Sequence, residues 1–145
     1  MTAKPPIPDG AAFFSDRGPD PVGAYPHARR VGNLLFVSGM GPRQRGEKDI
    51  PGVTRDASGA VLSYDIAEQC RAVFRNIRVI LEDAGSAWEN IVDVTVFLTD
   101  MQRDFAAYNR LYAEHFTHQP TRTTLEVTAL PTTINIEIKV IATIG

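Results

Sequence analysis

The stretch DIAEQCRAVFRNIRVILEDAG, residues 65–85, contains the clearest secondary-structure signal in the chain. Asp65 can cap the start of a helix, Glu68 follows three residues later, and Gly85 suits the end. Apolar side chains recur in it at the three- and four-residue spacing of one helix face: Ala67, Cys70, Val73, Phe74, Ile77, Ile80, Leu81 and Ala84. The sequence therefore predicts a helix over residues 66–84, with Cys70 as a core residue rather than a nucleophile.

Strands are predicted on both sides of this helix. Upstream, residues 25–38 form a β-hairpin around the turn dipeptide Gly32-Asn33. Downstream, residues 86–89 resemble a short capping box, and residues 91–98 alternate as a strand with one apolar face: Val92, Val94, Val96 and Leu98. Residues 39–63 are rich in Gly, Pro and charged residues, and are predicted to form an unusually long loop. Loops of this length are usually either functional or mobile.

A second helix is predicted over residues 103–116, with Phe105, Tyr108, Leu111 and Tyr112 buried. Residues 122–130 and 134–143 are predicted as two strands joined at Pro131. The order ββαβαββ, with hairpins at both ends, indicates an α+β sandwich with both helices on one face of the sheet. Residues 1–20 are expected to form an irregular N-terminal arm, and residues 21–145 a single domain.

The last strand also bears on assembly. Its apolar face carries Ile134, Ile136, Ile138 and Val140, and its other face carries Asn135, Glu137, Lys139 and Ile141. This second face of the sheet would be partly apolar and exposed in a monomer, which is a liability unless a partner covers it. A homo-oligomer is the simplest expectation.

Composition narrows the function classes. The formal charge of -2 gives no general attraction to nucleic acid or an anionic membrane. No apolar run approaches the roughly 20 residues needed to cross a bilayer, and the N-terminus lacks an apolar signal core. The single cysteine is compatible with a reducing cytoplasm, where we expect the protein to reside. Neither a nucleic-acid nor a membrane partner is expected.

Two polar residues make residues 120–138 the expected working site. Arg122 opens a predicted strand, where its planar guanidinium can bind a carboxylate through two parallel hydrogen bonds. Glu137 is the only carboxylate in residues 134–143, and a carboxylate among apolar neighbours can have a raised pKa and move protons. Each residue also has a purely structural interpretation. Arg122 could pair with a surface acid, and Glu137 with Lys139 or Arg122.

Other chemical motifs are weaker. No phosphate-binding glycine loop, nucleophile elbow or metal-cluster spacing is present. His115 and His118 end the second predicted helix without a third ligand nearby, so a solvated helix end is the better interpretation and no metal is expected. His27, close to Tyr25, could border a pocket or lie on the surface.

Several blocks together resemble the Rid (reactive intermediate deaminase, YjgF-like) family in order and spacing. They are GAY (23–25), LFVSG (35–39), the helical segment 69–81, VTVFLTDM (94–101), DFAAYN (104–109), PTRT (120–123) and IEI (136–138). The resemblance implies a chorismate-mutase-like α+β fold and a homotrimer with a central β-barrel and three clefts between subunits. It also implies hydrolysis of enamines or imines to ketones and ammonia without a cofactor.

The resemblance assigns roles to individual residues. Arg122 would bind the substrate carboxylate, and Glu137 would orient and partly deprotonate the attacking water. Tyr25 would lie at the edge of the cleft, and Asn109 would also line it. Thr124 occupies a position where many family members have cysteine, and the loop over residues 39–63 is longer than usual.

Three segments resemble the 2-aminomuconate deaminase branch of that family: GAYPHARR (23–30), SGMGPR (38–43) and PTRTT (120–124). A substrate with two carboxylates needs a second cation, because burying an unpaired carboxylate is expensive. Arg43, Arg45, Arg55 and His27 are candidates, although the arginines could equally solubilise a loop. The alternatives are a general deaminase of 2-iminopropanoate-type compounds and a non-catalytic, ligand-binding trimer.

Overall fold

The computed structural model describes residues 4–145, and the helix marked most clearly by the sequence is α1 (Ile66–Asp83). The carboxylate of Asp65 accepts a hydrogen bond from the backbone N–H of Ala67 at 2.9 Å, so this residue caps the helix as predicted. Gly85 follows the last turn with φ of 84°, a backbone conformation that glycine adopts without strain. Cys70 and the other apolar positions from Val73 to Ala84 are buried.

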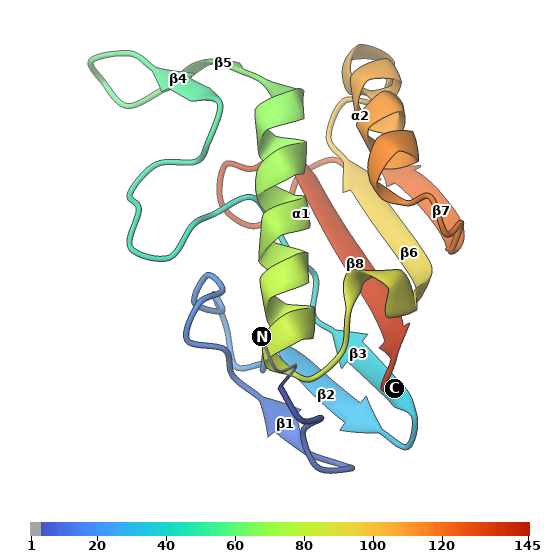
Figure 1. The fold of residues 1–145 in the computed structure, drawn as a ribbon. Helices are drawn as coiled ribbons and strands as arrows, with labels where there is room; N and C mark the ends of the chain where they lie inside the picture. The colour runs from blue at the N-terminus through green and yellow to red at the C-terminus, as the bar shows by residue number, and fades with distance from the viewer. Residues whose placement is uncertain (1–3) are drawn as a thin grey trace.

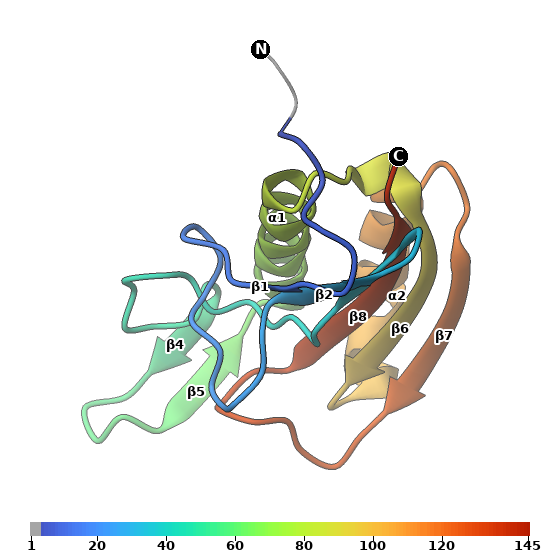
Figure 2. The ribbon, with the colours of Figure 1, turned by 90° about the horizontal axis from the view of Figure 1, so that it is seen from below.

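A six-stranded sheet covers this apolar face. Its spatial order is β1 (Ala12–Phe13), β2 (Ala28–Val31), β3 (Leu34–Val37), β8 (Ile136–Thr143), β6 (Ile91–Leu98) and β7 (Thr121–Glu126). The helix α2 (Met101–His115) connects β6 to β7, and α1 and α2 lie on the same side of the sheet (Figure 1). Figure 2 shows the sheet curving around that side. The mixed α+β fold with both helices on one face is confirmed.

The predicted C-terminal hairpin is wrong. β7 pairs in parallel with β6, and β8 pairs antiparallel with β6 from the other side, so β7 and β8 are not neighbours. Because parallel neighbours need a crossover, α2 returns the chain along the sheet before β7 begins. β7 also ends at Glu126, before the predicted limit at residue 130.

The long connection contains a hairpin that the sequence analysis missed. β4 (Val53–Arg55) and β5 (Val61–Tyr64) form a separate two-stranded sheet that projects beyond the start of α1 (Figure 1). The expected capping box at residues 86–89 is also absent from the structure. The segment Trp88–Asn90 is a short 3-10 helix without a side-chain cap, and Ser86 instead donates to the carbonyl of Thr143.

Two predicted core residues are exposed. A register shift between Ile91 and Asp93 turns Ile91 inward, so Val92 is 43% exposed. On α2, Asp104 takes the inward position that periodicity would give to Phe105, which is 37% exposed. The carboxylate of Asp104 accepts a hydrogen bond from the phenol of Tyr64 at 2.7 Å, which satisfies a buried charged group.

The two faces of the sheet differ as the last strand predicted. Ile136, Ile138 and Val140 are buried beneath the helices. The opposite face carries Glu137 and Lys139, and Leu125 on the edge strand β7 is 43% exposed. Neither helix of residues 4–145 has the length and apolarity needed to span a bilayer.

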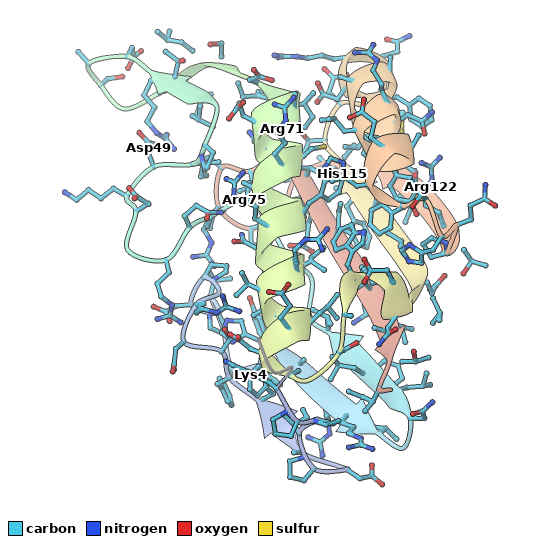
Figure 3. All side chains as sticks on the ribbon, in the orientation of Figure 1. Lys4, Asp49, Arg71, Arg75, His115 and Arg122 are labelled. Carbon is cyan, nitrogen blue, oxygen red and sulfur yellow. The ribbon has the colours of Figure 1, made fainter. Side chains whose placement is uncertain are left out.

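Within residues 4–20, Lys4, Ser15 and Arg17 contact the C-terminal end of α1. The buried carboxylate of Asp83 accepts hydrogen bonds from Lys4 at 3.0 Å, Ser15 at 2.8 Å and Arg17 at 2.6 Å. Figure 3 shows Lys4 beside this end of α1. Burial alone would raise the pKa of Asp83, but the hydrogen bonds from Arg17, Lys4 and Ser15 outweigh it and lower the pKa to about 2.

Candidate functional site

Arg122 lies near the start of β7, on the side of the sheet that faces α2 (Figure 3). One guanidinium N–H group donates to the side-chain oxygen of Asn109 at 2.8 Å. The guanidinium carbon lies 4.6 Å from the ring centre of Tyr112 and 5.4 Å from that of Tyr108. Because no acid within residues 4–145 pairs with Arg122, the surface ion pair considered for it is absent there, and other N–H groups are available to a ligand.

Two hydroxyl groups adjoin this arginine. The phenol oxygen of Tyr108 and the Oγ1 atom of Thr124 lie 2.9 Å apart. Tyr108 is fully buried, and burial raises the pKa of its phenol, so the phenol keeps its proton at neutral pH. The hydroxyl of Tyr112 is buried with no hydrogen-bond partner in the part of the chain that the structure describes. The start of β7 and α2 thus present one cation and several hydroxyl groups together.

Glu137 lies on β8 and points to the face of the sheet away from the helices, opposite Phe97. Burial raises the pKa of Glu137, and its carboxylate forms no ion pair or hydrogen bond among residues 4–145. Lys139, the partner considered for it, instead donates to the carbonyl of Val37 at 3.1 Å. A partly desolvated carboxylate without a cation is a stronger base than one in water.

Gly39 makes room for this carboxylate. A methyl group on Gly39 would lie 2.6 Å from Oε2 of Glu137, which is closer than any real contact. A side chain at position 39 would therefore force the carboxylate of Glu137 out of the position that it occupies here.

A small cavity of about 20 Å³ lies beside Gly39. Its volume suits about one water molecule. It is lined by Tyr25, His27, Ser38, Arg43 and neighbouring residues. Tyr25 is partly exposed, and its hydroxyl accepts a hydrogen bond from the backbone N–H of Val22.

His27 differs from the surface interpretation given above, since it is buried. Its Nδ1 accepts a hydrogen bond from the backbone N–H of Ser15 at 2.9 Å, so the proton is on Nε2, which lies 2.7 Å from the carbonyl of Pro19. Both ring nitrogens are therefore used inside the protein, and His27 is a poor candidate for the second cation.

The three candidate arginines differ in availability. Arg45 pairs with Asp20 and donates to two backbone carbonyls, and Arg55 pairs with Asp49. Arg43 donates to a single backbone carbonyl, that of Asp20, at 2.7 Å, and it has no acidic partner among residues 4–145. Of the three, Arg43 is the one that lines the cavity beside Gly39.

The structure does not bring Arg122 and Glu137 together within one chain. Arg122 pairs in register with Val94, which is buried under the helices, whereas Glu137 pairs with Phe97 on the other face. Two candidate half-sites therefore lie on opposite faces of the sheet. One contains Arg122 and Asn109, and the other contains Glu137 together with Tyr25 and Arg43, which line the cavity beside Gly39.

Two buried amides that support the Glu137 half-site were missed as such by the sequence analysis. Asn76 on α1 donates to the carbonyls of Gly41 and Arg43, at 2.9 and 2.8 Å. Gln69, two turns earlier on the same face of α1, exchanges two hydrogen bonds with Asn135, just before β8. The signal available in the sequence was a pair of amide residues on an otherwise apolar helix face. Buried side-chain amides are normally hydrogen-bonded, so this pair could have predicted specific hydrogen-bond partners for α1.

The remaining candidates are structural. Cys70 is buried, which raises the pKa of its thiol to about 12 and confirms it as a core residue. His115 Nδ1 lies 2.8 Å from the carbonyl of Leu111, and His118 Nε2 lies 3.1 Å from the carbonyl of Ile91.

Comparison with known proteins places these features in a family. The endoribonuclease L-PSP family profile matches residues 15–144. A RutC family protein of Pyrococcus abyssi is 38% identical over 131 residues, which cover 90% of this chain and 94% of the relative.

Two solved structures are similar throughout. The YjgF protein of E. coli is 30% identical with a TM-score of 0.76, covering 92% of this chain and 98% of its own. E. coli TdcF, solved with bound serine, is 29% identical with a TM-score of 0.77, covering 93% and 99%. The profile match and the RutC relative together show that this chain belongs to the endoribonuclease L-PSP family, whose members include RutC, YjgF and Rid proteins.

Proposed function

We propose that the protein hydrolyses an enamine or imine that carries a carboxylate, without a cofactor, and that 2-aminomuconate is its substrate, giving 4-oxalocrotonate and ammonia. One observation carries the proposal: an arginine without an acidic partner and a partly buried glutamate without a cationic partner, among residues 4–145. An unpaired guanidinium suits a substrate carboxylate, and an unpaired, desolvated carboxylate suits the activation of water.

The complete site in this proposal lies between two copies of the chain in a homotrimer. One copy contributes Arg122 and Asn109, and its neighbour contributes Glu137, Tyr25 and Arg43. The opposite orientation of the two half-sites supports this arrangement, because a head-to-tail ring brings different faces of identical chains together. The cavity beside Gly39, with a volume of about 20 Å³, is too small for a substrate molecule, which also favours a site completed by a second copy.

The chemistry needs only proton transfers. Arg122 holds the substrate carboxylate, with its guanidinium fixed by Asn109 and the two tyrosine rings. The oxygen of a water molecule attacks the imine carbon, the C=N electron pair moves to nitrogen, and Glu137 takes the proton of the water. Glu137 delivers that proton to nitrogen, which gives an aminol with one hydroxyl and one amino group. Glu137 then takes the hydroxyl proton and passes it to nitrogen, so that the C=O bond forms as the C–N bond breaks and ammonia leaves. An enamine substrate first tautomerises to its imine by one further proton transfer.

Arg43 is the residue that favours a substrate with two carboxylates. It lies in the half-site of Glu137, away from Arg122 on the same chain, and it has no acidic partner within residues 4–145. In the completed site, two arginines from different copies would therefore flank the reacting atoms and bind the two ends of the substrate. A second buried carboxylate without such a partner would be costly.

A second candidate is the deamination of small 2-imino acids such as 2-iminopropanoate. It is favoured by the bound serine in TdcF, because serine is a small amino acid with a single carboxylate. A non-catalytic trimer that binds small carboxylates is a third candidate, with the same arginine but no turnover.

The activity assay separates these candidates. 2-Aminomuconate is generated enzymatically in situ, and its absorbance loss and ammonia release are followed with wild type, Arg122→Ala and Glu137→Ala. We expect wild type to exceed the spontaneous rate and both variants to lose most of the excess. Faster turnover of 2-iminopropanoate would favour the general deaminase, and no excess over the spontaneous rate with either compound would refute the enzyme proposal.

Mixing the two variants tests where the site lies. In randomly mixed trimers of Arg122→Ala and Glu137→Ala chains, about a quarter of the clefts combine an intact Arg122 with an intact Glu137. We therefore expect two inactive variants to recover about a quarter of wild-type activity after co-refolding in equal amounts. A site within one chain would recover none, and that result would refute the cleft between copies.

A further inference from the structure

The hydroxyl pair of Tyr108 and Thr124 joins α2 to β7 beside Arg122, and no role assigned so far uses it. We propose that Thr124 donates a hydrogen bond to the carboxylate bound by Arg122, and that Tyr108 is the positioning residue that orients the Thr124 hydroxyl. This inference rests on the proposed carboxylate site, and it adds a specificity-determining residue to that site.

The direction of the hydrogen bond between Tyr108 and Thr124 can be assigned by finding an acceptor for each hydroxyl proton. Tyr108 is fully buried, and among residues 4–145 only Thr124 lies within hydrogen-bonding distance of its hydroxyl as an acceptor. If Thr124 donated to Tyr108, the phenol proton would be buried without an acceptor, which is unfavourable. Tyr108 therefore donates to Thr124, and the proton of Thr124 remains for another acceptor.

Strand geometry places that proton beside the cation. Residues two apart on a strand point to the same face, so Thr124 and Arg122 share the side of β7 that faces α2. Both contact Tyr108, Arg122 through its ring face and Thr124 through its hydroxyl. Thr124 is half-buried rather than fully buried, so a ligand can reach it. An anion on the free N–H groups of Arg122 is the acceptor that this arrangement fits.

The test measures binding of pyruvate, a stable product of 2-iminopropanoate hydrolysis, by isothermal titration calorimetry on the full-length protein. Thr124→Val keeps the branched shape and removes the hydroxyl, and we expect it to raise the Kd about tenfold. Thr124→Ser keeps the hydroxyl and should stay within about twofold of wild type. Thr123→Val, on the opposite face of the same strand, is the matched control and should leave the Kd unchanged.

Tyr108→Phe tests the positioning role. It should raise the Kd about threefold in wild type and cause no further loss in the Thr124→Val background, because its hydroxyl acts through Thr124. In turnover of 2-iminopropanoate, the KM should rise with kcat little changed. A purely structural role for the pair would lower the Tm of both variants and leave Kd and KM unchanged, and that result would overturn the inference.

The outcomes distinguish this inference from the proposed function. If wild type binds pyruvate through Arg122 but does not deaminate, a weaker Kd for Thr124→Val still supports the inference while the enzyme proposal fails. If deamination occurs and Thr124→Val has wild-type Kd and KM, the inference fails and the enzyme proposal stands. No binding of pyruvate to wild type would overturn this inference, whereas the enzyme proposal is decided by the turnover assay alone.

Discussion

Asp83 offers a stability test whose magnitude can be worked from the structure. Its buried carboxylate accepts hydrogen bonds from Lys4, Ser15 and Arg17, which together tie the N-terminal segment to the end of α1. These bonds lower its pKa from 3.8 to about 2. A carboxylate whose pKa falls on folding adds stability above its unfolded pKa, and that stability is lost as the pH drops through the folded value.

The difference between 3.8 and about 2 corresponds to about 2.5 kcal/mol of unfolding free energy at pH 7, at about 1.4 kcal/mol per pH unit. The side chain of Asp83 is 5% exposed, so screening by solvent at the carboxylate is small. Asp83→Asn removes the charge and keeps the size. We therefore expect it to destabilise the protein by about 2.5 kcal/mol at pH 7 and by much less below pH 2.

Urea unfolding of wild type and Asp83→Asn at pH 7 and at pH 1.5, at one chain concentration, measures both differences. Hydrogen exchange adds a local readout, because the backbone N–H groups of Arg17 and Gly18 both donate to Ser15, which is itself bonded to Asp83. These two amides should exchange faster in the variant at pH 7. An equal free-energy difference at both pH values would refute the assigned role of the Asp83 charge.

Four further predictions concern the two half-sites and the amide that supports one of them. Arg43→Ala should raise the KM for 2-aminomuconate much more than the KM for 2-iminopropanoate, because the second has no distal carboxylate; equal effects would exclude Arg43 as the second cation. Glu137→Gln should lower kcat by about a hundredfold to ten-thousandfold. In wild type the acidic limb of the kcat/KM profile should lie above pH 4.5, since burial raises the pKa of Glu137 and the base must be ionised; a limb at or below that pH would argue against Glu137. Asn76→Ala should lower stability by about 1–3 kcal/mol in urea unfolding, because the carbonyls of Gly41 and Arg43 lose their buried donor.

Sequence periodicity predicted the helices and strands more reliably than it predicted which strands pair in the sheet. The helix from residue 66, the strand from residue 91 and the hairpin around Gly32 were all found within a few residues of their predicted limits. The sequence pattern of β7 does not reveal its partner, because a parallel and an antiparallel neighbour place the same side chains on the same faces. The C-terminal hairpin was wrong for this reason.

Side-chain pairing was the other limit. The position of Glu137 on a half-exposed strand face followed from alternation, but its lack of a cation depends on Lys139 reaching the carbonyl of Val37. Likewise, the burial of His27 depends on Ser15 and Pro19, which lie in the segment expected to be irregular. Contacts between residues distant in sequence decide such details, and one sequence does not contain them.

Gly39 and Glu137 are nearly a hundred residues apart in sequence but are in contact in the structure. This contact restricts which residues can occupy the two positions during evolution. Any side chain at position 39 would meet the carboxylate at 2.6 Å, so an ancestor could enlarge position 39 only after position 137 had become smaller or had turned aside. We therefore expect relatives that hold a glutamate at position 137 in this orientation to have glycine at position 39. Across its relatives, an alignment of positions 39 and 137 measures how often this close approach is kept.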